Sequence, residues 1–435
     1  MLFEFKKNIQ KHFPELLQEK FLLACSGGLD SVVLTQLCSQ CEMDFAIAHC
    51  NFKLRGNDSD ADEVFVRNLA FSLNKEFIVT HFDTKSYAAK HKMSVQMAAR
   101  ELRYQWFEDL MLENNIKTLV TAHHADDNLE TFIINLSRGT GIKGLIGIPS
   151  RTDTILRPLL TFSRDQISVF AKSGNIEWRE DVSNAETKYL RNKIRHQIVP
   201  LLKELHPTFL DNFSTTQKYL SQTEAISENH LHHIKESLFV IDGDIIRIGI
   251  DSLSNLEPLD AYIYGLFKEY GFTEWEDVRS LLTAMSGKEV HSRTHRLVKD
   301  RDFLLLAQNT SLNEHSYQIK ESDTQIHTPI NLSMCSVDDL EETNTNTLYV
   351  DKETLKYPMT LRKWQKGDYF YPLGMKGRKK LSKYFKDEKI DVIAKEKQWL
   401  LCSDNQVVWI VGKRADERFK VTDNTKNILK IMFNS

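Results

Sequence analysis

The 435-residue sequence contains few cysteines and no long apolar segment. Six cysteines do not suggest a disulfide framework in so long a chain, so we expect reduced thiols and a cytoplasmic protein. No apolar run approaches the roughly 18 residues that span a bilayer, so no membrane association is expected. The amphipathic start is interrupted by Pro14 and has no small-residue cleavage site, so we expect no secretory signal.

A strong net charge is also lacking, because the formal charge is only −3. The average hides an asymmetry. Residues 361–389 contain ten Lys or Arg and three acids and carry a net charge of +7. Residues 320–345 contain six acids and one lysine and carry a net charge of −5. A basic block that follows an acidic, polar stretch predicts a separate module with its own partner.

The first two hundred residues alternate short apolar runs with helical patterns. This alternation predicts an α/β domain whose parallel sheet is covered on both faces. The expected strands are FLLAC (21–25), FAIAHC (45–50), EFIVTHF (76–82) and TLVTAHH (118–124). Ligands of such sheets bind beyond the carboxyl ends of the strands, so the polar residues that follow these runs are expected to share one site.

The alternation of apolar runs and helical patterns does not continue through the rest of the chain. A chain of 435 residues is also too long for a single hydrophobic core. We expect four regions: an α/β domain (1–205), a mostly helical middle domain (206–310), a linker with little order (311–347) and a small α+β C-terminal domain (348–435). Within the middle domain, HRLVKDRDFLLLA (295–307) predicts a β-hairpin.

The segment CSGGLDS (25–31) lies between the first strand and a helix. Free backbone N–H groups and the helix dipole favour an anion at such a point, and glycines let the backbone approach it closely. A tight turn with a helix cap explains the same residues equally well. No lysine follows, which excludes the Walker A pattern.

A second glycine-rich segment, GTGIKG (139–144), fits the dinucleotide-binding pattern. That pattern requires a preceding strand and a following helix. Here the segment follows the helical run LETFIINLS, and Pro149 comes soon after, so we reject nicotinamide binding. We expect a flexible loop over a nucleotide instead.

Histidines and acids cluster in HHADDNLET (123–131), but the spacing provides no Cys or third His for a zinc site. Helical phasing places Asp127 and Glu130 roughly opposite an apolar face. That face consists of Leu129, Phe132, Ile133 and Leu136. The two carboxylates could hold a cationic amine or Mg²⁺, and a solvated acidic face is the alternative.

The segment CSQC (38–41) could be half of a metal or cluster site. Cys38 and Cys41 share a helical face with leucines, however, and no cysteine occurs between Cys50 and Cys335. This pattern favours packed small hydrophobic side chains.

Arginines and aromatic side chains suggest contacts with phosphate and with bases. Arg100, Arg103, Arg191 and Arg195 have the geometry that phosphate requires, although solvated helix faces explain them almost as well. The basic block interleaves its charges with five aromatic residues, which suits RNA, although some of them must be core. They are Trp364, Tyr369, Tyr371, Tyr384 and Phe385.

Several of these motifs together resemble a known family. SGGLDS is similar to the signature of the PP-loop ATP pyrophosphatases, which release pyrophosphate and leave AMP on a substrate. Five more segments narrow the resemblance to the tRNA(Ile)-lysidine synthetases, densely over the first two hundred residues and again near the C-terminus. They are HCNFKLRG (49–56), residues 121–148, RPLL (157–160), WREDVSNAETKYLRNKIR (178–195) and residues 361–387.

The resemblance implies a reaction at the wobble cytidine of the isoleucine tRNA with a CAU anticodon. ATP would transfer AMP to the C2 oxygen of cytosine and release pyrophosphate. The ε-amine of free L-lysine would then attack C2, and AMP would leave. ATP and Mg²⁺ are the implied ligands, the middle and C-terminal domains are expected to contact the tRNA, and a homodimer is possible.

The resemblance also implies site residues. The expected ATP-binding residues are Ser26, Gly27, Gly28, Leu29, Asp30, Ser31, His49, Arg138 and Gly139. The expected catalytic residues are Asp30, Arg103, Asp127 and Glu130, with Asp127 and Glu130 binding lysine and Asp30 beside Mg²⁺. The expected tRNA-binding residues are Arg191, Arg195, Lys376, Arg378, Lys379 and Lys380.

Three other functions would use parts of the same sequence. A PP-loop tRNA cytidine 2-thiolase would form the same adenylate but attack it with sulfur, and the missing cysteine cluster argues against it. A PP-loop amidoligase acting on a small acid would not need the basic C-terminal module. A non-catalytic tRNA-binding protein would release no pyrophosphate in response to lysine.

Overall fold

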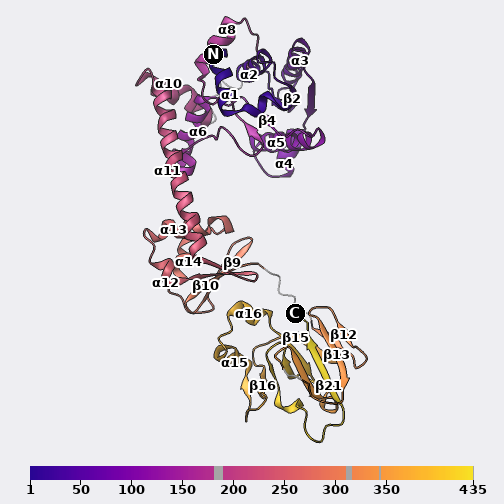
Figure 1. Cartoon of the computed structure of the whole chain (residues 1–435). Helices are drawn as coiled ribbons and strands as arrows, with labels where there is room; N and C mark the ends of the chain where they lie inside the picture. Colours follow the sequence, from indigo (N-terminus) through magenta and orange to yellow (C-terminus); the bar gives the residue numbers. More distant parts are fainter. Residues whose placement is uncertain (181–189, 310–315, 342–343, 435) are drawn as a thin grey trace. The chain divides into compact units, whose positions relative to one another are not determined.

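The computed structural model describes residues 1–180, 190–309, 316–341 and 344–434 (Figure 1). The chain divides into two compact units, Met1–Glu228 and Asn229–Ser435, and helix α11 (Phe209–Leu238) contributes residues to both. In the described parts of the chain, every helix is too short or too polar to cross a bilayer.

The first unit is built on a parallel five-stranded sheet with the strand order β3-β2-β1-β4-β5. Its strands are β1 (Phe21–Ala24), β2 (Phe45–Asn51), β3 (Phe77–His81), β4 (Leu119–Val120) and β5 (Ile155–Leu156). The first four confirm the strands that the apolar runs predict. The fifth strand, β5, lies outside the four predicted runs.

Helices cover both faces of this sheet, as the sequence predicts. They include α1 (Leu2–His12), α2 (Leu29–Gln40), α3 (Asn57–Ser72), α4 (Thr84–Lys90), α5 (Val95–Glu113), α6 (Ala125–Arg138) and α8 (Arg164–Ser173). Side chains alternate along a strand, so Phe21 and Leu23 join a core with α1, α2 and α8, whereas Leu22 joins another with α5. Both faces of β1 are therefore buried, which explains its continuous apolar run.

A helical group packs beside α6. It consists of α7 (Ile142–Leu145), α9 (Leu190–Lys193), a π-helical segment (Ile194–Ile198), α10 (Val199–Glu204) and the first part of α11. Leu129 of α6 is buried with Ile194 and Val199, and Ile133 packs against them. The predicted packing of Leu136 is wrong: its side chain lies near the end of α6, outside this cluster, and is 57% exposed.

The predicted hairpin 295–307 is confirmed as β9 (His295–Asp300) and β10 (Phe303–Gln308). It belongs to a five-stranded antiparallel sheet that the sequence does not predict, with β6 (Phe239–Asp242), β7 (Ile245–Gly249) and β8 (Glu289–His291). Helices α12 (Ile250–Ser254), α13 (Leu259–Phe267) and α14 (Trp275–Ser280) share a hydrophobic core with this sheet.

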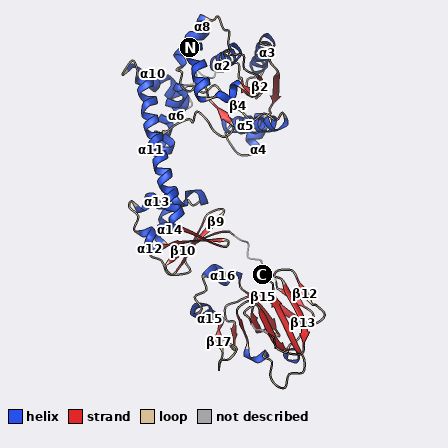
Figure 2. Ribbon diagram, viewed as in Figure 1, coloured by secondary structure: helices blue, strands red, loops and turns tan. Residues whose placement is uncertain are grey.

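Strands dominate the C-terminal part of the second unit (Figure 2). One sheet contains β11 (Tyr317–Ile319), β15 (Met359–Lys363), β18 (Trp399–Ser403), β19 (Gln406–Ile410) and β20 (Arg414–Ala415). Another contains β12 (Gln325–Ile326), β13 (Leu332–Val337), β21 (Ile428–Phe433) and β14 (Thr347–Asp351). A short hairpin of β16 (Tyr369–Phe370) and β17 (Lys379–Lys380) precedes helices α15 (Leu381–Asp387) and α16 (Val392–Lys397).

The expectation of little order at 311–347 is wrong for most of that stretch. Strands β11, β12 and β13 lie within it and pair with neighbouring strands of both sheets. The segment is polar overall, but Ile319, Leu332 and Met334 are buried in the C-terminal core. Alternation of a few apolar residues is enough to build a strand whose other face is polar. Residues 310–315 and 342–343 lie outside the described residues.

Candidate functional site

The loop 25–31 leads from β1 into α2, as predicted. Gly27 has a φ of 88°, which L-residues rarely adopt, and a Cβ there would lie 3.3 Å from Val66 of α3. The Ser31 hydroxyl accepts the N–H of Ser26 at 3.2 Å and donates to the Gly28 carbonyl at 2.9 Å. Gly28 is the N-cap residue of α2, and no side chain caps the helix there. Of the two interpretations that the sequence leaves open, this geometry favours the anion site over the side-chain cap.

A buried carboxylate on α3 pairs with two arginines, one of which also contacts this loop through its backbone. Asp62 pairs with Arg179 at 2.9 Å and with Arg55 at 2.5 Å. The backbone N–H of Arg179 donates to the Gly27 carbonyl at 2.9 Å. Sequence reasoning missed these three residues as a group, although Arg55 and Arg179 lie in two of the resembling segments. Within the segment 178–195, residues 181–189 lie outside the described residues.

Asp30, in the first turn of α2, faces the start of α6. Its Oδ1 atom is buried and has no hydrogen-bond partner among the described residues, and its Oδ2 lies 3.6 Å from Nε2 of His124. His124 is the N-cap residue of α6 and forms a reciprocal capping box with Asp127, whose Oδ2 lies 3.4 Å from the same Nε2. The buried His124 ring therefore links the loop to the predicted lysine-binding pair.

The electrostatic interactions between His124 and its neighbouring carboxylates favour the charged forms of His124 and Asp127. Burial by itself lowers the pKa of His124, but the carboxylates of Asp127 and Asp30 raise its pKa overall. Burial raises the pKa of Asp127, yet His124 and then Arg191 bring it below the usual range. The neighbouring His123 behaves differently, because burial lowers its pKa to about 4.

Asp127 and Glu130 point into a cluster with two arginines rather than toward solvent. Glu130 Oε1 accepts from Arg195 Nε at 2.5 Å, and Glu130 Oε2 accepts from Arg191 Nε at 2.7 Å and from Arg195 at 3.0 Å. Asp127 Oδ1 accepts from Arg191 at 3.1 Å and from Arg195 at 2.9 Å. The alternative of a solvated acidic face is excluded, because only 1% of the Glu130 side chain is exposed.

The positions of Arg191 and Arg195 differ from those of an open basic face. The sequence predicts that both bind tRNA, but their guanidinium groups lie on the two carboxylates. Burial by itself lowers the pKa of Arg195, but its hydrogen bond to Glu130 and the negative charges of Glu130, Asp127 and Asp30 together raise the pKa overall. These contacts favour a role in the site over direct phosphate binding.

The other predicted residues of the first unit lie outside the cluster of Asp127, Glu130, Arg191 and Arg195. His49 is buried, its Nδ1 lies 2.9 Å from the Cys25 carbonyl oxygen, and burial lowers its pKa. Arg138 and Gly139 end α6, and Gly139 has a φ of 73°. Arg103 of α5 is exposed and stacks over Phe52 at 5.2 Å. The ATP contacts of His49, Arg138 and Gly139 and the catalytic role of Arg103 stay predictions.

The two motifs that suggest other cofactors have ordinary structural roles. GTGIKG follows helix α6 rather than a strand, which agrees with rejecting a dinucleotide site, and its last residues begin the short helix α7 instead of a loop. Cys38 is buried in the core and Cys41 packs against it. Over the residues that the structure describes, no group of three or more His, Cys, Asp or Glu is placed to hold a metal.

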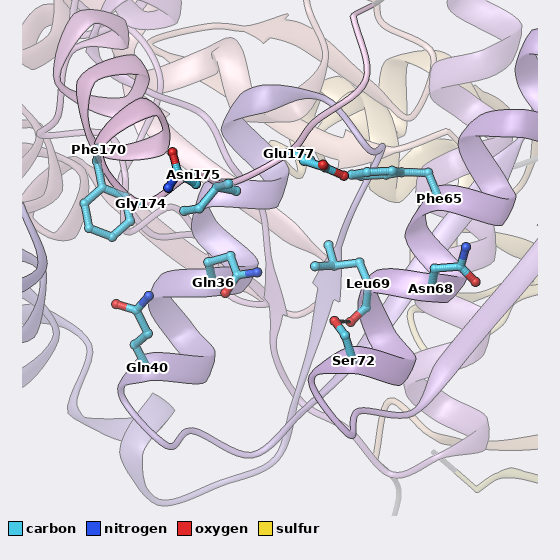
Figure 3. Close-up of a pocket in the computed structure, with 11 residues that line it drawn as sticks. Gln36, Gln40, Phe65, Asn68, Leu69, Ser72, Phe170, Gly174, Asn175 and Glu177 are labelled. Carbon is cyan, nitrogen blue, oxygen red and sulfur yellow. Dashed lines mark hydrogen bonds between the residues drawn. The ribbon is translucent and has the colours of Figure 1, made fainter.

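The described surface of the first unit includes two hollows of different chemical character. The larger, of about 550 Å³, lies among α2, α3 and α8 and is lined by amides such as Gln36, Asn68 and Asn175 (Figure 3). None of the predicted site residues lines it. The second, of about 440 Å³, borders Glu130 and Arg195 and carries both signs of charge in its wall. Its chemistry, rather than its size, makes it the better candidate for an amino-acid substrate.

The basic C-terminal block presents most of its cations to solvent. Lys376, Arg378 and Lys380 are exposed, whereas Lys379 is half-buried and pairs with Asp387 at 2.8 Å. Its aromatic residues divide as expected. Phe385 and Tyr384 belong to a hydrophobic core and Trp364 packs against it, but Tyr369 is 41% exposed, with the Arg378 guanidinium 5.4 Å from its ring.

Comparison with known families matches three parts of the chain. A PP-loop domain model matches residues 1–202, a TilS substrate binding domain model matches residues 241–309, and a TilS substrate C-terminal domain model matches residues 359–431. Among solved structures, a U34-tRNA thiolase from Methanococcus maripaludis aligns at 17% identity over 50% of this chain and 78% of its own, with a TM-score of 0.43.

Full-length relatives give the most specific comparison. A tRNA(Ile)-lysidine synthase from Parabacteroides distasonis is 40% identical over 418 residues, which cover 95% of both chains. One from Bacteroides thetaiotaomicron is 35% identical over 425 residues, which cover 97% of both. The chain belongs to the tRNA(Ile)-lysidine synthase family.

Proposed function

We propose that this protein uses ATP to join L-lysine to C2 of the wobble cytidine in tRNA(Ile) with a CAU anticodon, releasing AMP and pyrophosphate. One structural observation supports this reaction independently of the similarity to the family. The glycine loop and the buried Asp127–Glu130 pair are adjacent and are linked through His124, so one site offers both an anion-binding turn and a cation-binding pair.

The loop accounts for the first half of the reaction. The C2 oxygen of cytosine is a poor leaving group, and transfer of AMP to that oxygen makes it a good one. Ser26, Gly28 and Ser31 shape a turn whose helix N-terminus would receive the departing pyrophosphate. Asp30 fits a Mg²⁺ ion that accompanies ATP, because its buried Oδ1 atom has no partner within the described chain and hard cations take oxygen ligands. Such an ion would neutralise phosphate charge.

The carboxylate pair accounts for the second half. The ε-amine of lysine is protonated in water near pH 7, so the site must bind a cation and then remove its proton. Asp127 and Glu130 would hold the ammonium, and one of these two carboxylates would accept its proton. The adjoining 440 Å³ hollow, with acids and bases in its wall, would hold the α-amino and α-carboxylate groups.

The exposed cations and Tyr369 of the C-terminal block would contact the tRNA. Lysines and arginines neutralise phosphates, and an exposed aromatic ring can stack on an unpaired base. The described cysteines form no cluster that would support sulfur transfer, and the relatives are lysidine synthases, so the thiolase alternative is not favoured.

The proposal is tested by supplying labelled lysine or labelled sulfur with ATP and the isoleucine tRNA. We expect lysine label in tRNA and pyrophosphate release that requires tRNA, and we expect Asp30→Ala to lose both while still binding tRNA. Sulfur incorporation would instead favour the thiolase. Binding without any pyrophosphate release would show a non-catalytic protein.

A further inference from the structure

The lysine-binding pair of the proposed function already holds two cations. Two carboxylates and two guanidinium groups give the cluster of Asp127, Glu130, Arg191 and Arg195 a net charge of zero. A lysine ammonium added to this cluster would leave one uncompensated positive charge beside a buried Glu130. Burying an unpaired charge is costly, so one resident cation has to leave when lysine enters.

The hydrogen bonds identify which arginine can leave. Arg191 donates to Glu130 Oε2 and to Asp127 Oδ1, and each of these oxygens also accepts from Arg195. Withdrawal of Arg191 therefore leaves both oxygens with a donor. Withdrawal of Arg195 would leave Glu130 Oε1 without the donor that it has in the structure.

Exposure supports the same choice. The Arg191 side chain is 42% exposed, whereas that of Arg195 is 19% exposed. Arg191 can therefore exchange its carboxylate partners for water with less rearrangement than Arg195. Its helix, α9, has only four residues and continues directly into a π-helical segment, a form of helix that often occurs at functional sites.

We propose that Arg191 occupies the place of the lysine ε-ammonium in the unliganded enzyme and is exchanged for it on binding. The ammonium would take over Glu130 Oε2 and Asp127 Oδ1, and Arg195 would remain to orient both carboxylates. Arg191 is then a positioning residue that keeps the buried pair neutral without substrate and sets the apparent affinity for lysine. This inference rests on the proposed function.

The test compares lysine kinetics of the wild type and of Arg191→Ala at saturating ATP and tRNA. Removing the internal competitor should lower the apparent KM for lysine. The expected decrease is on the order of tenfold if Arg191 occupies the site about nine-tenths of the time, because apparent affinity scales with the fraction of open sites. Guanidinium ion at millimolar concentration should fill the vacated place and raise that KM in Arg191→Ala, but not in the wild type.

Lys193→Ala is the matched control, because Lys193 is exposed on the same helix and its substitution removes the same charge. Its lysine KM should stay at the wild-type value. Arg191→Lys, which retains the charge but loses the planar fork, should lie between the wild type and Arg191→Ala and serves if the alanine variant does not fold.

An unchanged or increased lysine KM in both Arg191 variants, with tRNA still modified, would overturn the exchange and leave the proposed function intact. If the wild-type protein itself joins no lysine to tRNA, the proposed function fails first. Direct titration of L-lysine into both proteins separates a change in binding from a change in the chemical step.

Discussion

The acidic pair of α6 and the basic C-terminal block both concentrate charge, and they use it in opposite ways. Asp127 and Glu130 are buried, and Arg191, Arg195 and His124 satisfy them. In the basic block, by contrast, Lys376, Arg378 and Lys380 face solvent. Exposure, rather than the number of charges, separates charged groups that pair with one another in the interior from charged groups that solvent, or an RNA phosphate, can reach.

The largest effect is expected from breaking the buried cluster. Glu130→Gln removes the charge that pairs with both arginines, and losing one partner of a buried ion pair costs about 3–5 kcal/mol. Because Arg191 is partly exposed, we expect the lower end, about 3 kcal/mol, in urea unfolding, together with loss of lysine-dependent modification. A change in unfolding free energy below about 1 kcal/mol would show that solvent already screens the cluster.

The opposite region should respond in the opposite way. Replacing Lys376, Arg378 and Lys380 together by alanine should leave the unfolding free energy within about 0.5 kcal/mol, because these side chains are exposed. The slope of log tRNA affinity against log salt should become shallower by about 2–3, at roughly 0.7–0.9 for each lost phosphate contact. An unchanged slope would indicate a merely solvated basic surface.

The buried His124 should make the stability of the protein depend on pH. A raised pKa in the folded protein stabilises it fully below the unfolded value of about 6.5, and that contribution is lost as pH rises through the higher folded pKa. The stability gap between the wild type and His124→Asn should therefore be wide at pH 6 and narrow toward pH 9. A gap that widens with pH would mean that the neutral ring is the favoured form.

The smallest expected effect is a difference in the salt dependence of tRNA binding between substitutions of two neighbouring lysines in the basic block. Lys380 is exposed, whereas Lys379 already pairs with Asp387, so Lys380→Ala should reduce the salt slope of tRNA binding by about 0.7–0.9 and Lys379→Ala by less. Equal slopes for the two variants would show that the Lys379–Asp387 pair opens when tRNA binds.

Local patterns predicted much of the first unit, because strands buried on both faces and amphipathic helices leave a clear periodicity. Such patterns could not reveal contacts between distant segments. The arginine partners of Asp127 and Glu130 lie more than sixty residues further along the chain, and Asp62 meets Arg179 across 117 residues. Strands β11 and β13 were missed for a related reason. Each has only a few apolar residues, and these become significant once β15 and β21 lie beside them.

Nucleoside mass analysis directly tests whether lysine is joined to the wobble cytidine. The protein would be incubated with ATP, L-lysine and tRNA(Ile) with a CAU anticodon, and the tRNA would then be digested to nucleosides. We expect the wobble cytidine to be converted to lysidine, with its mass increased by that of lysine minus one water, only when ATP and lysine are both present. An unmodified cytidine, or a 2-thiocytidine, would contradict this expectation.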